Sequence, residues 1–159
     1  MEYSIDFAER LIEAANLFVD KSHPGEDADR AVLYLSLLSC EISLKAVLER
    51  AGYTPDHLRN RSHNLDALLS DLCHCETKDS EVGTWRSAAH IQSISPIPGA
   101  ELATVGRLLD AESEGASKYP SSIRYGELIK HYDSVHMLEC AKAVAEWVRK
   151  HMAAIRMRP

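Results

Sequence analysis

The segment from Asp27 to Ala51 constrains the fold more than any other part of the sequence. Its apolar residues form two stripes at helical spacing: Ala31, Leu35, Leu38 and Ile42, and Leu33, Leu37, Leu44 and Leu48. A helix that is apolar around most of its circumference is buried among other helices. Gly52 follows directly and is placed to end this helix. The sequence therefore predicts a long central helix with others packed around it.

Shorter helical patterns flank this central segment. Apolar spacing and capping residues predict helices over residues 4–18, from Asn64 to about 72, over 81–91, over 100–111, and from Asp133 or Ser134 onward. In the first of these helices, the face expected to turn inward is formed by Phe7, Leu11, Ala14, Ala15 and Phe18. In the first of the two middle helices we expect Trp85 to point inward, and the second has Leu102, Val105, Leu108 and Leu109 as its apolar residues.

Composition and length favour a single helical domain. The chain has 159 residues, of which 26% are charged and only 6% aromatic. These values are ordinary for one globular domain, and the low aromatic content favours helices over sheets. Alternation of apolar and polar residues never extends beyond a few positions, so no strand is predicted. We expect residues 1–159 to form one all-α domain, an up-and-down helical bundle.

The N-terminal residues and the lengths of the apolar runs predict a cytoplasmic location. The first residues include Glu2 and Asp6, where a secretory signal would need basic residues. The longest apolar-rich stretch, from Ala31 to Leu38, is far shorter than the roughly 20 residues that span a bilayer. We therefore expect no membrane segment and four reduced cysteines.

Charge is distributed unevenly along the chain. The net charge is −6, whereas non-specific nucleic-acid binders usually carry a basic face. Residues 149–159 nevertheless contain no acidic residue and four basic ones: Arg149, Lys150, Arg156 and Arg158. Basic residues stabilise the last turn of a helix through its dipole, which is the simpler interpretation. Contact with RNA or with an acidic partner is the alternative.

Three motifs in a fixed order resemble those of the HEPN family. The central helix contains Glu41-x-x-Leu44-Lys45-Ala46, which is similar to the family's E-x-x-L-K-A pattern. The helix start at 63–65 resembles an H-D-L motif, and Ile123-Arg124-Tyr125 resembles an R-Y-P loop before the last helix. Gly126 replaces the usual proline of that loop. The resemblance covers about residues 40–150.

The resemblance implies a bundle of about five helices that is often a homodimer. Some members of the family are metal-independent ribonucleases of toxin–antitoxin or defence systems. Others are non-catalytic partners of nucleotidyltransferases, or nucleotide-binding modules. We expect a non-catalytic interaction domain, or one that binds a nucleotide or RNA. The residues expected to contribute to binding are His63, Arg124 and Tyr125.

A catalytic alternative rests on Arg124 and His131. Ribonuclease members of the family use an arginine, then four to six other residues, then a histidine, and six residues lie between Arg124 and His131. Histidine supplies a base near neutral pH, and arginine stabilises charge that develops on phosphate. The family usually has a polar residue after the arginine, whereas Tyr125 follows here. Whether the chain is an enzyme stays open at this point.

Two other groups of residues are interpreted as structural. Arg86 and His90 are expected to form a solvated pair flanking buried alanines at 88 and 89. The Cys73-His74-Cys75 run lacks both the usual spacing and a second cysteine pair for a zinc site. We therefore expect neither a metal nor a cofactor.

Overall fold

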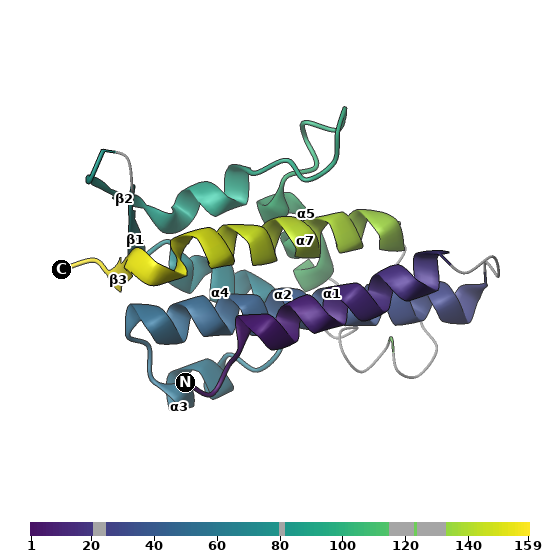
Figure 1. The fold of residues 1–159 in the computed structure, drawn as a ribbon, viewed down its shortest axis with the longest axis horizontal. Helices are drawn as coiled ribbons and strands as arrows, with labels where there is room; N and C mark the ends of the chain where they lie inside the picture. Colours follow the sequence, from purple (N-terminus) through teal and green to yellow (C-terminus); the bar gives the residue numbers. More distant parts are fainter. Residues whose placement is uncertain (21–24, 80–81, 115–122, 124–132) are drawn as a thin grey trace.

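A computed structural model describes residues 1–20, 25–79, 82–114, 123 and 133–159. Its elements, in chain order, are α1 (Ile5–Asp20), α2 (Glu26–Ala51), α3 (Pro55–Asn60), α4 (Leu65–Leu72), β1 (Cys75–Lys78), β2 (Trp85–Ser87), η1 (Ala88–Ser93), α5 (Val105–Glu114), α7 (Ser134–His151), η2 (Met152–Ala154) and β3 (Ile155–Met157). Figure 1 shows the long helices α1, α2 and α7 lying side by side, with the strands gathered near the C-terminal end of α7. The predicted mostly helical fold is confirmed.

The central position predicted for α2 is confirmed by its burial. It packs against α1, α4 and α7, and the stripe that contains Leu33 and Leu44 is fully buried. Gly52 adopts the left-handed conformation, with φ of 115°, and ends the helix as expected. Within the described part of the chain, α2 is long and apolar enough to cross a membrane, but 72% of its most apolar window is buried inside the fold. Burial among other helices accounts for the same composition.

The predicted buried face of α1 is wrong: the face that is buried is rotated by about a quarter of a turn around the helix axis. Phe7 and Phe18 are 52% and 40% exposed, whereas Ala8 and Ile12, which were not assigned to the inward face, are buried; Ala15 is completely buried as predicted. The hydroxyl of Ser39 in α2 donates a hydrogen bond to the carbonyl of Ala8 at 2.9 Å. Helix backbones approach this closely only over small residues, so alanines occupy the contact and the phenylalanines are displaced from it.

The expectation of a purely all-α fold is also wrong, because the chain contains a small antiparallel sheet. Its strand order is β2-β1-β3, with Thr77 of β1 paired to Arg86 of β2 and to Ile155 of β3. Strands of three or four residues are too short to show an alternating pattern in the sequence. The sheet joins the middle of the chain to the residues that follow α7.

The middle region departs from the two helices predicted there. Where a helix was expected, Trp85–Ser87 form β2 and Ala88–Ser93 form the 3₁₀ helix η1, and Trp85 is 36% exposed instead of buried. The following α-helix begins at Val105, later than expected, so that Leu102 lies in a turn and is 74% exposed. Ala88 and Ile91 of η1 are completely buried and hold this region against the helices.

Polar residues fix the start of α7. Asp133 caps the helix as predicted, and its carboxylate accepts a hydrogen bond from the backbone N–H of Val135. The Ser134 hydroxyl donates to the carboxylate of Asp29 near the start of α2, at 3.0 Å. These contacts set the position of α7 along α2, and hence the position of the residues at its C-terminal end.

Candidate functional site

His90 has both ring nitrogens engaged, and its partners determine where its proton lies. The indole N–H of Trp147 in α7 donates to His90 Nε2 at 2.8 Å, and His90 Nδ1 lies 2.8 Å from the carbonyl oxygen of Ser87. An indole N–H can only donate, and a carbonyl can only accept. His90 is therefore neutral with its proton on Nδ1. With both nitrogens used, it positions Trp147 and has no free nitrogen for a ligand.

His151 lies against the same indole but keeps one nitrogen free. Its ring stacks on Trp147 with centroids 4.5 Å apart, and its Nδ1 donates to the Trp147 carbonyl at 2.8 Å. Burial lowers the pKa of the imidazole, the positive charge of Lys150 lowers it further, and the hydrogen bond to Trp147 opposes these effects. His151 is therefore neutral at pH 7, and the lone pair on its Nε2 is available as an acceptor or a base.

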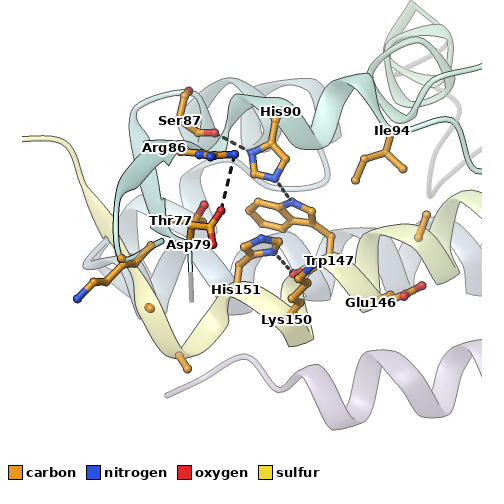
Figure 2. A pocket seen from close by; sticks show the side chains of 15 residues that line it. Thr77, Asp79, Arg86, Ser87, His90, Ile94, Glu146, Trp147, Lys150 and His151 are labelled. Atoms are coloured by element: carbon orange, nitrogen blue, oxygen red, sulfur yellow. Dashed lines mark hydrogen bonds and ion pairs between the residues drawn. The ribbon is translucent and has the colours of Figure 1, made fainter. Parts of the chain in front are cut away.

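These rings line a pocket of about 1060 Å³ between the β1–β2 hairpin, η1 and the end of α7. Figure 2 shows His90, Trp147 and His151 clustered there, with Arg86 and Asp79 close by. Three basic and two acidic side chains contribute to the lining: Lys78, Arg86 and Lys150, and Asp79 and Glu146. The pocket thus carries a net positive charge on a chain whose total is −6. Its volume suits a small organic ligand.

The cations of the pocket are available to an anion. Arg86 is loosely paired with Asp79 at 3.7 Å, and its side chain is 65% exposed. Among the residues that the structure describes, Lys78 and Lys150 have no ion-pair partner, and both are exposed. Phosphate binds readily to such side chains through charge-assisted hydrogen bonds. The arrangement therefore combines a hydrogen-bond acceptor, His151 Nε2, with cations that have spare donors.

The predicted binding residue His63 lies elsewhere. Its Nδ1 is 2.9 Å from the Glu41 carboxylate, which also accepts a hydrogen bond from Lys45 at 2.8 Å. The predicted ion pair of α2 is present and is almost completely buried, with side chains 5% and 6% exposed. Lys45 also lies 5.4 Å from the centre of the Tyr3 ring. His63 thus covers a buried ion pair and does not line the pocket.

The other predicted site residues fall outside the described part of the chain. Arg124, Tyr125 and His131 belong to residues 124–132, so their proposed roles stay predictions. Of the two alanines expected to be buried between Arg86 and His90, Ala88 is completely buried and Ala89 is half-buried, while Arg86 contacts Asp79 and His90 contacts Trp147. The pair is also part of the pocket, which the sequence interpretation missed. Trp147 and His151 of the pocket were also missed. The sequence signal that could have found them is their spacing, four residues apart on one face of a helix.

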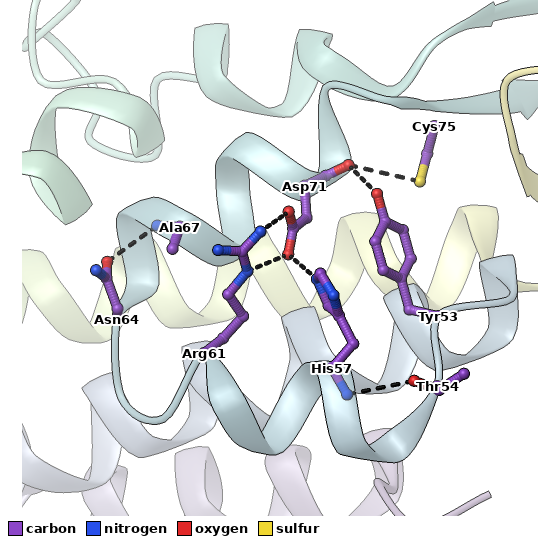
Figure 3. Close-up of polar contacts among 8 residues, drawn as sticks. All are labelled: Tyr53, Thr54, His57, Arg61, Asn64, Ala67, Asp71 and Cys75. Atoms are coloured by element: carbon purple, nitrogen blue, oxygen red, sulfur yellow. Dashed lines mark hydrogen bonds and ion pairs between the residues drawn. The ribbon is translucent and has the colours of Figure 1, made fainter.

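A second polar cluster is built around Asp71 (Figure 3). Its buried carboxylate accepts two hydrogen bonds from Arg61, at 2.8 and 2.6 Å, and a third contact comes from His57 at 2.9 Å. Burial raises the pKa of Asp71, but the hydrogen bonds from Arg61 and His57 outweigh it and bring the pKa below its usual value. The carbonyl of Asp71 accepts from the Tyr53 hydroxyl. This cluster holds α3 and α4 together.

The described residues offer no metal site. Among them, no group of three or more His, Cys, Asp or Glu side chains is placed to hold a metal ion. Cys73 accepts a hydrogen bond from Gln92, and Cys75 is buried. Burial and the nearby carboxylate of Asp71 raise the pKa of Cys75 to about 11, which leaves it a neutral thiol and a poor metal ligand.

Comparisons of the chain with protein-family models, with curated proteins and with solved structures find no match. The likeness to HEPN domains therefore rests on the three sequence motifs. The pocket formed by Trp147 and His151 is the candidate functional site.

Proposed function

We propose that this domain binds a ribonucleotide, free or within RNA, in the pocket formed by His151, Arg86 and Lys150. The observation that carries the proposal is the neutral His151 imidazole, whose Nε2 accepts hydrogen bonds, next to cations with spare donors. A ligand that contacts both the His151 acceptor and the cations must carry a hydrogen-bond donor at one end and an anionic group at the other. A ribose hydroxyl and a phosphate provide that combination.

The chemistry of each residue suggests how such a ligand would be held. His151 Nε2 would accept from a ribose hydroxyl or from an amino group of the base. Arg86 and Lys150 would donate to the phosphate oxygens. Trp147 and His90 would act as positioning residues, because their mutual hydrogen bond holds the His151 ring in place. The resemblance to HEPN domains, some of which are nucleotide-binding modules, agrees with this proposal.

Calorimetric titration with the four ribonucleoside monophosphates tests the proposal. We expect saturable binding by the wild type, weakened about tenfold by Lys150→Ala and by His151→Ala, because each loses a hydrogen bond of about 1.5 kcal/mol. Lys142→Ala is the matched control: it removes the same charge from α7, but Lys142 does not line this pocket. The proposal fails when no monophosphate binds, or when the control variant loses as much affinity as Lys150→Ala.

A metal-independent endoribonuclease is the second candidate. It was predicted from Arg124 and His131, and a neutral His151 in the same pocket as Arg86 favours similar chemistry among the described residues. Incubation of labelled RNA in EDTA with the wild type, His131→Ala and His151→Ala distinguishes the candidates. Under the leading proposal none of the three proteins cleaves. Cleavage that only one variant abolishes would assign the reaction to that histidine.

We propose in addition that the domain forms a homodimer, as the family resemblance implied. Exposed apolar side chains on α1 support this, since Phe7, Leu17 and Phe18 are 52%, 62% and 40% exposed. Analytical ultracentrifugation should find a dimer for the wild type and a monomer for the double variant Phe7→Ser, Phe18→Ser. A nucleotidyltransferase-type partner, a role in a toxin–antitoxin or defence system, and a cytoplasmic location stay predictions from the sequence.

A further inference from the structure

The outer face of the three-stranded sheet carries an unusual set of exposed side chains. Paired residues on adjacent strands point to the same face, and successive residues alternate. Thr77 and Ile155 are buried on one face, which leaves the opposite face to the residues of the other parity. That outer face carries Glu76, Lys78, Trp85, Ser87, Arg156 and Arg158.

Trp85 of β2 and Arg156 of β3 form a stacked pair on this face, although β1 lies between their strands. The guanidinium carbon of Arg156 lies 3.9 Å from the centre of the Trp85 ring, and the tryptophan remains 36% exposed. A cation beside an aromatic ring gains about 0.5–1 kcal/mol at an exposed site, and it holds both groups in place. Trp85 is thus presented to solvent in a fixed orientation, supported from one side.

The charge of the outer face is positive. Glu76 is its only acidic residue among those six, and it is shared between Arg156 at 3.3 Å and Arg158 at 4.0 Å. Lys78 lies next to Trp85 in the register of β1 and β2. Three cations around one carboxylate leave a surplus of donors for an anion. This is the feature that complements a phosphate backbone.

The outer face is continuous with the pocket. Lys78 and Ser87 belong to the sheet face and also line the pocket. Arg86 and Thr77, which alternation assigns to the opposite face of the sheet, line the pocket as well, so that Lys78 and Ser87 are the residues the two sites share. A chain of nucleotides leaving the pocket past Lys78 would therefore meet Trp85 next.

We infer that the ligand is a single-stranded oligonucleotide, with one nucleotide in the pocket and a neighbouring base stacked near Trp85 on the outer face. The inference rests on the proposed function, because the pocket supplies the first contact. Aromatic rings within a basic groove bind successive bases of single strands with little sequence preference, since every base has a flat face. Lys78, Arg156 and Arg158 contact the phosphates on either side of that base.

Binding of ribonucleoside monophosphates and of fluorescein-labelled single-stranded RNA hexamers tests the inference. We expect the hexamer to bind at least tenfold more tightly than the monophosphate. Trp85→Leu should weaken hexamer binding about tenfold and leave monophosphate binding within twofold of the wild type. Trp85→Phe, which retains a ring, should restore most of the hexamer affinity and guards against a loss caused by misfolding of the hairpin.

The salt dependence provides an independent readout. Each phosphate contact to a single strand contributes about 0.7 to the slope of log affinity against log salt concentration. Arg158→Ala should reduce that slope by about this amount for the hexamer and leave the monophosphate slope unchanged. Arg107→Ala, which removes an exposed cation from α5, should alter neither slope.

The outcomes separate the two proposals. Equal affinities for monophosphate and hexamer, with no effect of Trp85→Leu, overturn this inference and leave the pocket as a mononucleotide site. Absence of binding by both ligands overturns the proposed function together with this inference. Displacement of the hexamer by poly-glutamate at matched charge concentration would assign the outer face to an acidic protein and also overturn the inference.

Discussion

The Asp71 cluster and the His151 pocket each bring a histidine, an arginine and an aromatic ring together, but only the cluster contains a buried carboxylate. In the cluster, Asp71 is 5% exposed and accepts from both Arg61 and His57. In the pocket, the imidazoles bond to a carbonyl and to an indole, while Arg86 reaches its nearest carboxylate only at 3.7 Å.

The two regions differ in how many charged and hydrogen-bonding groups remain free to bind a ligand. In the cluster, opposite charges satisfy one another, and the result is a brace between α3 and α4. In the pocket, the rings fix one another through neutral contacts, so the cations and His151 Nε2 keep their capacity to bind. Perturbed titration and spare hydrogen-bonding groups in a concave site are typical of binding sites. The comparison therefore predicts that variants of the cluster affect stability and variants at the pocket surface affect binding.

The largest effect is expected at the cluster. Asp71→Asn removes the charge that Arg61 and His57 contact, and it should lower the free energy of unfolding by about 2–3 kcal/mol. Urea denaturation measures this change. Asp110→Asn makes the same substitution at an exposed position of α5 and should change stability by less than about 0.5 kcal/mol. Equal losses in the two variants would contradict the role assigned to Asp71.

The same carboxylate should make stability sensitive to acid. Because the pKa of Asp71 is lower in the folded state than its ordinary value of 3.8, the contribution is complete above that pH. It is lost as the pH falls from about 3.8 through the folded-state pKa. Wild type and Asp71→Asn should therefore converge in stability when melting is followed toward strongly acidic pH, and parallel curves would argue against the ion pair.

A smaller effect is expected at the base of the pocket. Trp147→Phe preserves a ring but removes the N–H that His90 Nε2 accepts, so stability should fall by about 1 kcal/mol. Monophosphate affinity should fall as well, since the His151 ring loses part of its support. Trp85→Phe is the matched control on the sheet. It should leave monophosphate affinity unchanged, and a loss there would show that the two tryptophans are not independent.

The smallest effect concerns the titration of His151. Its pKa is lower in the folded state than the usual 6.5, so as the pH falls through that value the unfolded chain takes up the proton first. The wild type should lose some stability between pH 7.5 and 5.5, and His151→Asn should lose less. His74→Asn replaces an exposed histidine and should behave as the wild type does. Monophosphate binding should weaken over the same range, as Nε2 becomes protonated.

The helices were predictable because their signals are local. The stripes of α2, the Gly52 terminus and the caps at Asn64 and Asp133 each depend on residues within a few positions of one another, and all are present. The face of α1 was not predictable from apolar size. Ser39 approaches the Ala8 backbone, so space at the contact, and not hydrophobicity, decides which side is buried.

The sheet and the pocket depend on contacts between residues far apart in the chain. β3 pairs with β1 across most of the second half of the sequence, and Trp147 bonds to a histidine 57 residues earlier. Neither strand is long enough to be predicted from an alternation of apolar and polar residues. Trp147 and His151 are four residues apart and share a helical face, but the sequence analysis did not single them out, and nothing in the sequence indicated that η1 would bring His90 against them.

The strand order β2-β1-β3 has a consequence for a chain made from its N-terminus. The β1–β2 hairpin emerges from the ribosome well before Ile155–Met157. One edge of β1 therefore stays unpaired while α5 and α7 are synthesised. Unpaired edges are the places where nascent chains associate wrongly. Lys78 at the end of β1 and Asp79 just after it place charge beside that edge, which discourages pairing with another chain until β3 arrives.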